Sequence, residues 1–296
     1  MNRRTSLIGA TALALLPLAA FAQSKELVLY CSVGEEWCRA QSEAFTRETG
    51  INVLMTRKSS GETFAQIKAE AGQPRGDIWW GGTGDPHLQA AQEGLTEEYR
   101  SPMLTELQPW AVAQAETSGF RTVGIYAGAL GFGYNATLVT ENPPACWKDL
   151  LDPRFRDDIQ VANPNSSGTS YTMLATMVQL LGEDEAFAYL GAPIVTVAPC
   201  EGTGYEVGSM SIIKGGPNPD AAKAWYDWAL SAKAQEIGAS VNSFQVPSNK
   251  SAATPPQAPK LDQIKLIDYD FAKYGSSEVR TALLARWDAE IGALPK

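Results

Sequence analysis

Short apolar stretches alternate with helix-like stretches along the first part of the chain. Gly50 marks the end of the first of these helices, and a run of glycines follows the third apolar stretch. We predict strands at 25–30, 51–55 and 77–80, and helices at 35–49, 61–71 and 86–93. Strands and helices that alternate at this spacing predict a parallel α/β sheet.

In a parallel α/β sheet, ligands bind beyond the carboxyl ends of the strands. Three polar loops fall there, at 32–34, 59–61 and 82–84. They make Ser32, Ser60, Gly61 and Thr83 candidate ligand residues. Neighbours on a strand face opposite ways, so one tryptophan of the Trp79–Trp80 pair points into the core, and we expect Trp80 to face the ligand.

The middle of the chain crosses into a second lobe. Strand-like residues at 123–126 and 130–134 are followed by a short helix at 147–151, a strand at 158–162, a helix at 168–181 and a strand at 194–197, and the chain crosses back over 201–213. We therefore predict lobe 1 at 23–124 and 204–262, and lobe 2 at 125–203 and 263–296.

The N-terminal 22 residues have the pattern of a secretory signal. Arg3 and Arg4 precede an apolar run that ends in Ala20-Phe21-Ala22, a small-x-small cleavage site. The run is too short for a membrane anchor, so we predict export to the periplasm. The formal net charge of −9, without a basic run, argues against nucleic acid or anionic lipid as a partner.

Four cysteines in an exported chain favour two disulfides over free thiols. We favour Cys31–Cys38 and Cys146–Cys200, although the sequence alone allows three pairings. A metal site is the weaker interpretation, because no CxxC motif occurs and His87 is the only histidine.

The stretch 199–235 joins a polar, Gly-rich loop to the apolar strand 210–213 and then to a helix. Asn218 is placed as its N-cap, Pro219 at its first position and Asp220 in its first turn. Apolar residues three and four positions apart, including Trp225 and Trp228, give it one buried face. This order, followed by Ser-x-x-Ala-Gln, resembles bacterial extracellular solute-binding proteins of ABC importers, and more narrowly their iron(III)-type group.

The resemblance covers most of the chain after residue 22. It implies a two-lobed α/β fold of type II periplasmic binding proteins, each lobe a mainly parallel sheet flanked by helices. It also implies a monomer without enzymatic activity or cofactor, whose partners are a small solute and an ABC permease in the inner membrane. Relatives carry one or two further βα units where this chain has only 191–193. We therefore expect a reduced second lobe, shortened near 190–193.

The sequence 163–170 precedes an apolar helix and is rich in Ser, Asn and Thr. A helix start offers free backbone N–H groups and a positive dipole end, and hydroxyls add donors. Ser166, Ser167, Gly168 and Thr169 are therefore candidates for binding a phosphorylated sugar, a phosphonate or a carboxylate. The alternative is an ordinary helix cap, which the same residue types supply.

The return loop adds Glu201, Thr203 and Tyr205 as candidates. The carboxylate of Glu201 suits the hydroxyls of a sugar-like ligand or a cationic group, and Glu201 matches an acidic position of the resembling family. The Tyr205 ring suits stacking or donation. We interpret Glu206 as a solvated loop charge.

Other functions are weaker interpretations. Ferric iron requires several anionic oxygens, and iron-binding relatives carry a tyrosine pair, whereas this chain has no Tyr-Tyr pair. A secreted hydrolase lacks support, because neither GxSxG nor HExxH occurs. A sensory binding module without transport stays open. The leading hypothesis is hinge closure of two lobes around one solute.

Overall fold

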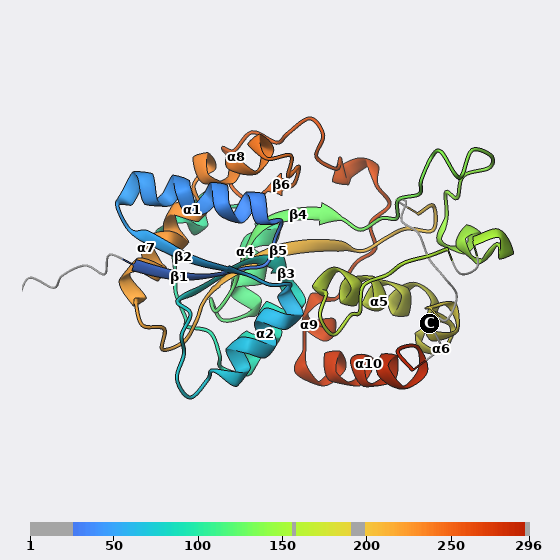
Figure 1. Cartoon of the computed structure of the whole chain (residues 1–296), viewed down its shortest axis with the longest axis horizontal. Coiled ribbons are helices and arrows are strands. Elements are labelled where there is room, and N and C mark those ends of the chain that lie inside the picture. The colour runs from blue at the N-terminus through green and yellow to red at the C-terminus, as the bar shows by residue number, and fades with distance from the viewer. Residues whose placement is uncertain (1–25, 156–157, 191–198, 294–296) are drawn as a thin grey trace, which may run out of the picture.

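The computed structural model describes residues 26–155, 158–190 and 199–293, which fold into two lobes (Figure 1). Lobe 1 is a sheet covered by helices, and lobe 2 is built from helices and loops. Two strands of the sheet, β4 (Val123–Ala129) and β5 (Tyr205–Ile212), run toward lobe 2 and connect the two lobes. The predicted signal segment, 1–22, lies outside the described residues.

The sheet of lobe 1 has the order β2-β1-β3-β5-β4-β6. Its remaining strands are β1 (Glu26–Cys31), β2 (Asn52–Arg57), β3 (Ile78–Thr83) and β6 (Val246–Pro247). The strand β1 pairs in parallel with β2 and β3, which confirms the prediction for this part of the chain. The returning strand β5 is antiparallel to β3 and β4, and β6 is antiparallel to β4.

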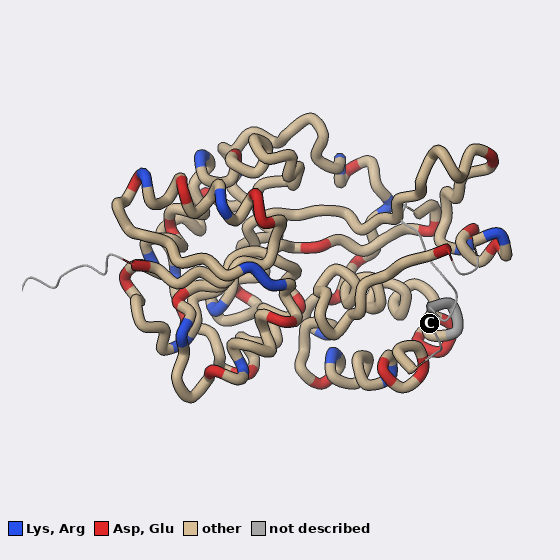
Figure 2. Tube along the Cα trace, viewed as in Figure 1, with Lys and Arg blue, Asp and Glu red and all other residues tan. Residues whose placement is uncertain are grey.

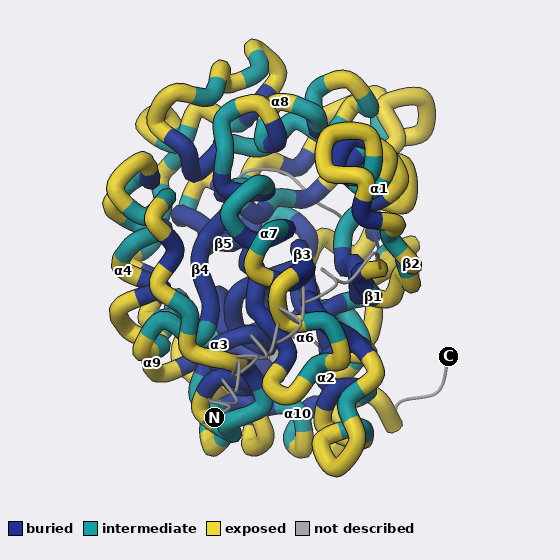
Figure 3. The backbone as a smooth tube through the Cα atoms, turned by 90° about the vertical axis from the view of Figure 1, so that its left-hand side faces the viewer, coloured by how far each residue is buried: buried dark blue, intermediate teal, exposed yellow. Residues whose placement is uncertain are grey.

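Helices cover both faces of this sheet. The strands β1, β3, β4 and β5 are mostly buried, whereas the edge strand β2 is exposed or half-buried (Figure 3). The larger core joins the sheet to α1, α4 and α7, and a smaller core around Trp79 and Phe64 joins it to α2 and α3. The helices are α1 (Glu35–Thr49), α2 (Ser60–Ala69), α3 (Gly84–Gln92), α4 (Pro109–Thr117), α7 (Pro219–Ala229) and α8 (Ala232–Ser240).

The sequence of α1 illustrates why these helices form where they do. Glu35 and Glu36 lie in its first turn, where negative charge interacts favourably with the helix dipole. Trp37 and Phe45 lie on its buried face. Gly50 ends the helix with φ of 74°, a left-handed conformation that glycine adopts without steric cost.

Lobe 2 packs around its own apolar core, to which Tyr171 of α5 and Trp287 of α10 contribute. Its elements are α5 (Gly168–Leu181), α6 (Glu183–Leu190), α9 (Phe271–Tyr274), α10 (Ser277–Glu290) and the 3-10 helices at Trp147–Leu151 and Pro153–Phe155. Further 3-10 helices lie at Pro102–Glu106 and Leu261–Gln263. Ile125 and Tyr126 of β4 belong to the core of lobe 1, and the division into lobes at 124 and 203 stays a prediction.

The expected second sheet is absent from the part of lobe 2 that the structure describes. Residues 130–134 and 158–162 are not strands, and every named strand among the described residues belongs to the sheet of lobe 1. An extended segment needs a neighbouring strand to satisfy its backbone groups, and these two segments have no strand beside them there. The strand expected at 194–197 lies outside the described residues.

Both favoured disulfides are present. Cys31–Cys38 joins the end of β1 to α1 inside lobe 1, and Cys146–Cys200 joins two loops of lobe 2. Acidic and basic side chains are interspersed along the described chain (Figure 2).

Candidate functional site

Two helices, one from each lobe, begin at the same place. The helix α2 follows β2 in lobe 1, and α5 begins in lobe 2 after the polar stretch 163–167. The Gly61 N–H donates to the carbonyl oxygen of Ser166 at 3.0 Å, and the Ser59 hydroxyl donates to the same oxygen at 2.6 Å. The lobes therefore touch where the two positive helix ends converge.

The first turns of both helices are capped by their own residues. Ser59 forms a capping box with Glu62 at the start of α2, and the Ser167 hydroxyl accepts from Ser170 N at 3.3 Å at the start of α5. The ordinary capping role is therefore real for Ser59 and Ser167. The hydroxyls of Ser60 and Thr169 take no part in these two caps.

The carboxyl end of β3 lies against these helix starts. A methyl group added at Gly168 would overlap the hydroxyl oxygens of Thr83 and Ser60, so the three residues are in contact. The Thr83 hydroxyl is buried and has no protein partner among the described residues. Two lobe 1 hydroxyls and the first residue of α5 thus converge on one point.

Ser32 lies beside this point on the loop after β1. Its hydroxyl accepts from the Trp79 indole at 2.9 Å and pairs with the Thr63 hydroxyl at 3.0 Å. A methyl group at Gly82 would lie 2.9 Å from the Ser32 Cβ and 2.7 Å from that of Ser60. The structure therefore brings the three predicted loops together, as the sheet topology predicts.

Glu206 and Thr169 extend the site along β5. Thr169 is exposed at the mouth of a pocket of about 200 Å³, which residues 130–132 and 160–162 also line. Burial raises the pKa of Glu206 to about 7; a side-chain hydrogen bond with Thr169 lowers it in part, and the charge of Asp85 raises it further. The Glu206 Oε1 is buried and has no protein partner among the described residues. Glu206 is therefore not the solvated loop charge that we expected.

Trp80 does not face the site. Its ring packs in the core of lobe 1, at 5.1 Å from the Trp37 ring and 6.3 Å from the Trp225 ring. Trp79, on the opposite face of β3, reaches Ser32 instead. The two rings lie on opposite faces of β3, as expected, but each is buried in a core, so the assignment of Trp80 to the ligand was wrong.

Glu201 is a structural cap in lobe 2. Its carboxylate accepts from Trp147 N at 2.8 Å and from Lys148 N at 3.0 Å, beside the Cys146–Cys200 disulfide. A carboxylate at the start of a helical turn satisfies backbone donors that have no other partner there. Each of its oxygens therefore accepts one backbone N–H, which is a capping role that the sequence did not indicate.

Tyr205 and Thr203 also lie outside the converging hydroxyls. The Tyr205 ring packs edge-on against Phe271 at 5.2 Å and lines a separate hollow between α4 and α9, because alternation along β5 turns it away from Glu206. Thr203 pairs through its backbone with Lys265 and Ile267 at 2.9 Å. Its buried hydroxyl has no protein partner among the described residues.

Asp85 is buried between the lobes, and we did not predict a role for it from the sequence. Its carboxylate accepts from the Thr172 hydroxyl at 2.9 Å and from the Tyr269 hydroxyl at 3.3 Å. Burial raises the pKa of Asp85, whereas Thr172, the charge of Arg280 and Tyr269 lower it. The only local signal is an acid in the first turn of α3, which is an ordinary position for a helix.

The site therefore consists of hydroxyls, helix starts and the carboxylate of Glu206. His87 is buried, hydrogen-bonded to Ser211 and the Gly81 carbonyl, and stacked on Trp79. Burial lowers its pKa to about 3, so His87 is neutral. Among the described residues, one group has its potential metal-ligand atoms close enough together to hold an ion: Cys146, Cys200 and Glu201. The two cysteines of this group are joined in a disulfide. This arrangement suits the binding of a polar solute rather than its chemical conversion.

Two lobes joined by crossing strands, with polar groups from both lobes at the contact, define a two-lobed solute-binding protein. Comparison with known proteins agrees. The model of the family "Bacterial extracellular solute-binding protein" matches residues 83–193. An uncharacterized protein of Haemophilus influenzae is 40% identical over 312 residues, which cover 90% of each chain. The structure of the periplasmic binding protein AfuA from Actinobacillus pleuropneumoniae, with fructose-6-phosphate bound, matches with a TM-score of 0.86 and 38% identity, covering 92% of this chain and all of that one.

The chain therefore belongs to the bacterial extracellular solute-binding protein family, and it is a periplasmic binding protein of the ABC-importer type rather than an enzyme. The periplasmic binding protein P5PA matches with a TM-score of 0.85 and 35% identity, covering 90% of this chain and 99% of that one. Iron-bound HitA from Pseudomonas aeruginosa, at 20% identity and a TM-score of 0.75 over 88% of this chain and 98% of that one, shares the fold. The α/β two-lobed fold is thereby confirmed. No helix among the described residues is long and apolar enough to cross a membrane.

The alignment with the Haemophilus influenzae relative spans more positions than the 296 residues of this chain. That relative therefore contains residues that this chain lacks. The placement of a missing segment near 190–193 stays a prediction, and residues 191–198 lie outside the described part of the chain.

Proposed function

We propose that this protein captures a small phosphorylated solute, a sugar phosphate foremost, between its two lobes and presents it to an ABC permease in the inner membrane. The observation that carries the proposal is the convergence of two helix starts with the hydroxyls of Ser60 and Thr83 at one point between the lobes. Backbone N–H groups, helix dipoles and hydroxyls are the donors that bind phosphate oxygens. A ligand that takes hydrogen bonds from both lobes stabilises their closed arrangement.

The remainder of the site supports a ligand with hydroxyl groups. The free Oε1 of Glu206 is an acceptor beyond the phosphate-binding turn, and Thr169 lies next to it. A sugar hydroxyl donates to a carboxylate with a favourable charge-assisted hydrogen bond. AfuA, with which this chain shares 38% identity, has fructose-6-phosphate bound.

A second candidate is an aminoalkyl phosphonate. A periplasmic protein of Salmonella typhimurium that is named for binding 2-aminoethylphosphonate is 29% identical over 157 residues, covering 52% of this chain and 43% of that protein. The carboxylate of Glu206 suits this class of ligand, because a carboxylate forms a charge-assisted hydrogen bond with an ammonium group as well as with a hydroxyl. Ferric iron ranks below both. The described Tyr171 and Tyr269 hydroxyls bond to the Tyr274 carbonyl and to Asp85, respectively, and do not converge as a phenolate pair.

Export through the signal at 1–22, a monomeric state and delivery to a permease belong to the same proposal. A sensory role without transport is the alternative. Genes for a permease and an ATPase next to the gene for this chain would favour transport, whereas their absence would favour sensing.

A thermal-shift series tests the ligand. We expect fructose 6-phosphate at a hundred times its Kd to stabilise the protein by about 2.7 kcal/mol, which is roughly 5–10 °C in Tm for a chain of this size. Ser60→Ala and Thr169→Ala each remove one donor, and we expect each to weaken binding by roughly tenfold. Fructose and inorganic phosphate should each shift Tm less than the combined ligand.

Ser42→Ala is the matched control, because the Ser42 hydroxyl bonds only to the Cys38 carbonyl within α1, away from the site. A larger shift with 2-aminoethylphosphonate would move the proposal to the second candidate. A response to ferric citrate alone, or equal shifts in Ser60→Ala and the control, would contradict the proposal.

A further inference from the structure

Asp85 lies at the start of α3 in lobe 1, but its carboxylate is bound by lobe 2. The residue is 1% exposed. Its Oδ2 accepts from the Thr172 hydroxyl of α5 at 2.9 Å, and its Oδ1 accepts from the Tyr269 hydroxyl at 3.3 Å. Both partners come from lobe 2, so these bonds exist only when the lobes are together.

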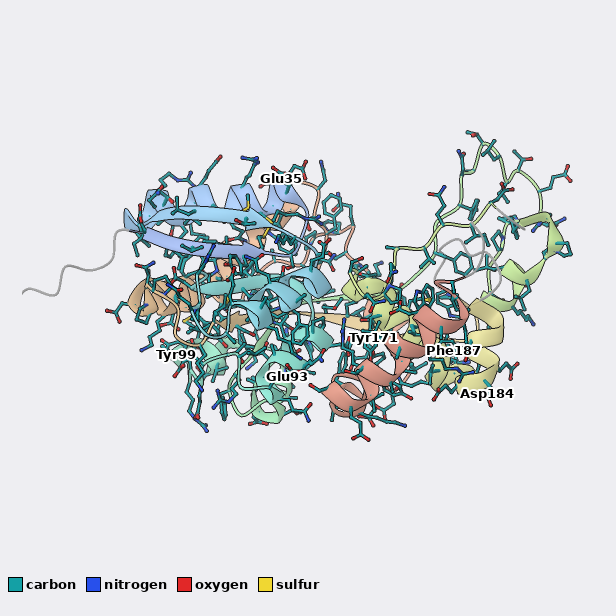
Figure 4. The ribbon with its side chains drawn as sticks, turned by 60° about the horizontal axis from the view of Figure 1, so that its bottom comes forward. Glu35, Glu93, Tyr99, Tyr171, Asp184 and Phe187 are labelled. Carbon is teal, nitrogen blue, oxygen red and sulfur yellow. A yellow bond between two sulfur atoms is a disulfide. The ribbon has the colours of Figure 1, made fainter. Side chains whose placement is uncertain are left out.

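The same face of α3 continues the contact with lobe 2. Gln89 accepts from the Arg280 guanidinium at 3.3 Å, Gln92 accepts from Ser277 N at 2.8 Å, and Glu93 accepts from the Ser277 hydroxyl at 2.9 Å. Residues 89, 92 and 93 follow residue 85 by four, seven and eight positions and therefore lie on one side of the helix. We call this row of contacts the interlobe seam; Glu93 and Tyr171 lie at the junction of the lobes in Figure 4.

A polar seam suits an interface that must open and close. Each group exchanges a protein partner for water when the lobes separate, so the net free energy of each hydrogen bond in the seam is small. An apolar seam of the same extent would hold the lobes shut. The seam thus keeps the two arrangements close in free energy, where a ligand can shift the equilibrium.

Asp85 also connects the seam to the site. The Thr172 hydroxyl that donates to Asp85 lies 3.2 Å from the Gly168 carbonyl at the start of α5. Asp85 follows Gly84, so it comes two residues after Thr83. One carboxylate therefore connects the end of β3 with the first turn of α5, the two elements that meet at the convergent hydroxyls.

We propose that Asp85 is a positioning residue that latches the lobes together and sets the first turn of α5 against the end of β3. It acts without touching the solute. The effect on affinity rests on the proposed function, because the solute has to bind at this turn of α5. The latch itself is independent of which solute binds.

Two nearly isosteric substitutions in lobe 2 test the latch, and they leave α3 unchanged. Thr172→Val removes the donor to Asp85 Oδ2, and we expect roughly a tenfold weaker Kd for fructose 6-phosphate, measured by isothermal titration. Tyr269→Phe removes the longer bond, and we expect roughly a threefold loss. Thr172→Ser, which keeps the hydroxyl, should restore the affinity.

Thr176→Val is the matched control. Thr176 is one turn further along α5 and equally buried, and its hydroxyl donates to the Thr172 carbonyl within the helix. Urea unfolding should show similar losses of stability for Thr172→Val and Thr176→Val, whereas only Thr172→Val changes Kd. Equal effects of the two variants on Kd would overturn the proposal.

Small-angle X-ray scattering without ligand separates the latch from the proposed function. If Asp85 is the latch, Thr172→Val has a larger radius of gyration than the wild type and Thr176→Val does not. That result would support the latch even if fructose 6-phosphate fails to bind the wild type, in which case only the proposed solute is wrong. Identical scattering of all three proteins, with unchanged Kd, would overturn the latch.

Discussion

Gly61→Ala is expected to weaken solute binding by roughly 5- to 150-fold while both lobes stay folded. A methyl group on Gly61 would overlap the Asn165 carbonyl oxygen and lie 2.7 Å from that of Ser166. Both oxygens belong to the backbone of lobe 2, so a side-chain rotation cannot relieve the overlap. Overpacking of this kind costs roughly 1–3 kcal/mol, which gives the stated range in Kd. Isothermal titration with fructose 6-phosphate measures the effect.

Alanine is compatible with the helical conformation of Gly61 and favours it, so the substitution strains only the contact between the lobes. Gly72→Ala is the control, because a methyl group there meets no atom within 4 Å and the residue lies outside the site. Unchanged affinity in Gly61→Ala would mean that the lobes do not meet at this point in the bound protein. A loss of stability equal to the loss of affinity would mean that the contact serves folding rather than closure.

Much of lobe 1 could be predicted because its signals are local. Gly50 ends α1, Ser59 caps α2, and the spacing of strands and helices requires the parallel arrangement of β1, β2 and β3. That topology places Ser32, Ser60 and Thr83 at one edge of the sheet before any contact is known. The favoured disulfides followed from predicted elements that lie close together in one lobe.

The residues that were misplaced depend on distant partners. Glu201 is separated by 54 residues from Trp147, whose N–H its carboxylate accepts. The larger core forms on the face of β3 that α7 covers, and α7 lies far along the chain. Alternation along β3 alone therefore could not tell which face Trp80 would occupy. The role of Asp85 depends on Tyr269, which is 184 residues away. Such partners leave no local pattern in the sequence.

Lobe 2 was harder to predict for a different reason. A segment with strand-like composition becomes a strand only beside another strand. Residues 130–134 and 158–162 have that composition, but the described part of lobe 2 offers them no such neighbour. The helix α5 formed where it was expected, because its apolar residues and its Ser167 cap act within the segment itself.

Glu206 makes the stability of the protein depend on pH in a direction that can be stated in advance. The pKa of Glu206 is about 7 in the folded protein, against an ordinary value of 4.5. Between these two values the folded state binds more protons than the unfolded state, so stability falls as the pH rises toward 7. Below the unfolded pKa both states are protonated, and the loss vanishes.

Glu206→Gln removes this loss, because glutamine carries no charge at any pH. We expect the variant to be more stable than the wild type at pH 8 by as much as about 3 kcal/mol, or roughly 5–10 °C in Tm, and the two Tm values to converge toward pH 4. Calorimetry without ligand across this range measures the difference, with Glu43→Gln, an exposed change on α1, as the control. A solute group that donates to the free Oε1 stabilises the ionised carboxylate of the wild type. At pH 8, saturation with fructose 6-phosphate should therefore reduce the amount by which the Tm of Glu206→Gln exceeds that of the wild type. A constant difference across the pH range, or one that Glu43→Gln reproduces, would place the Glu206 carboxylate in water rather than between the strands and α5.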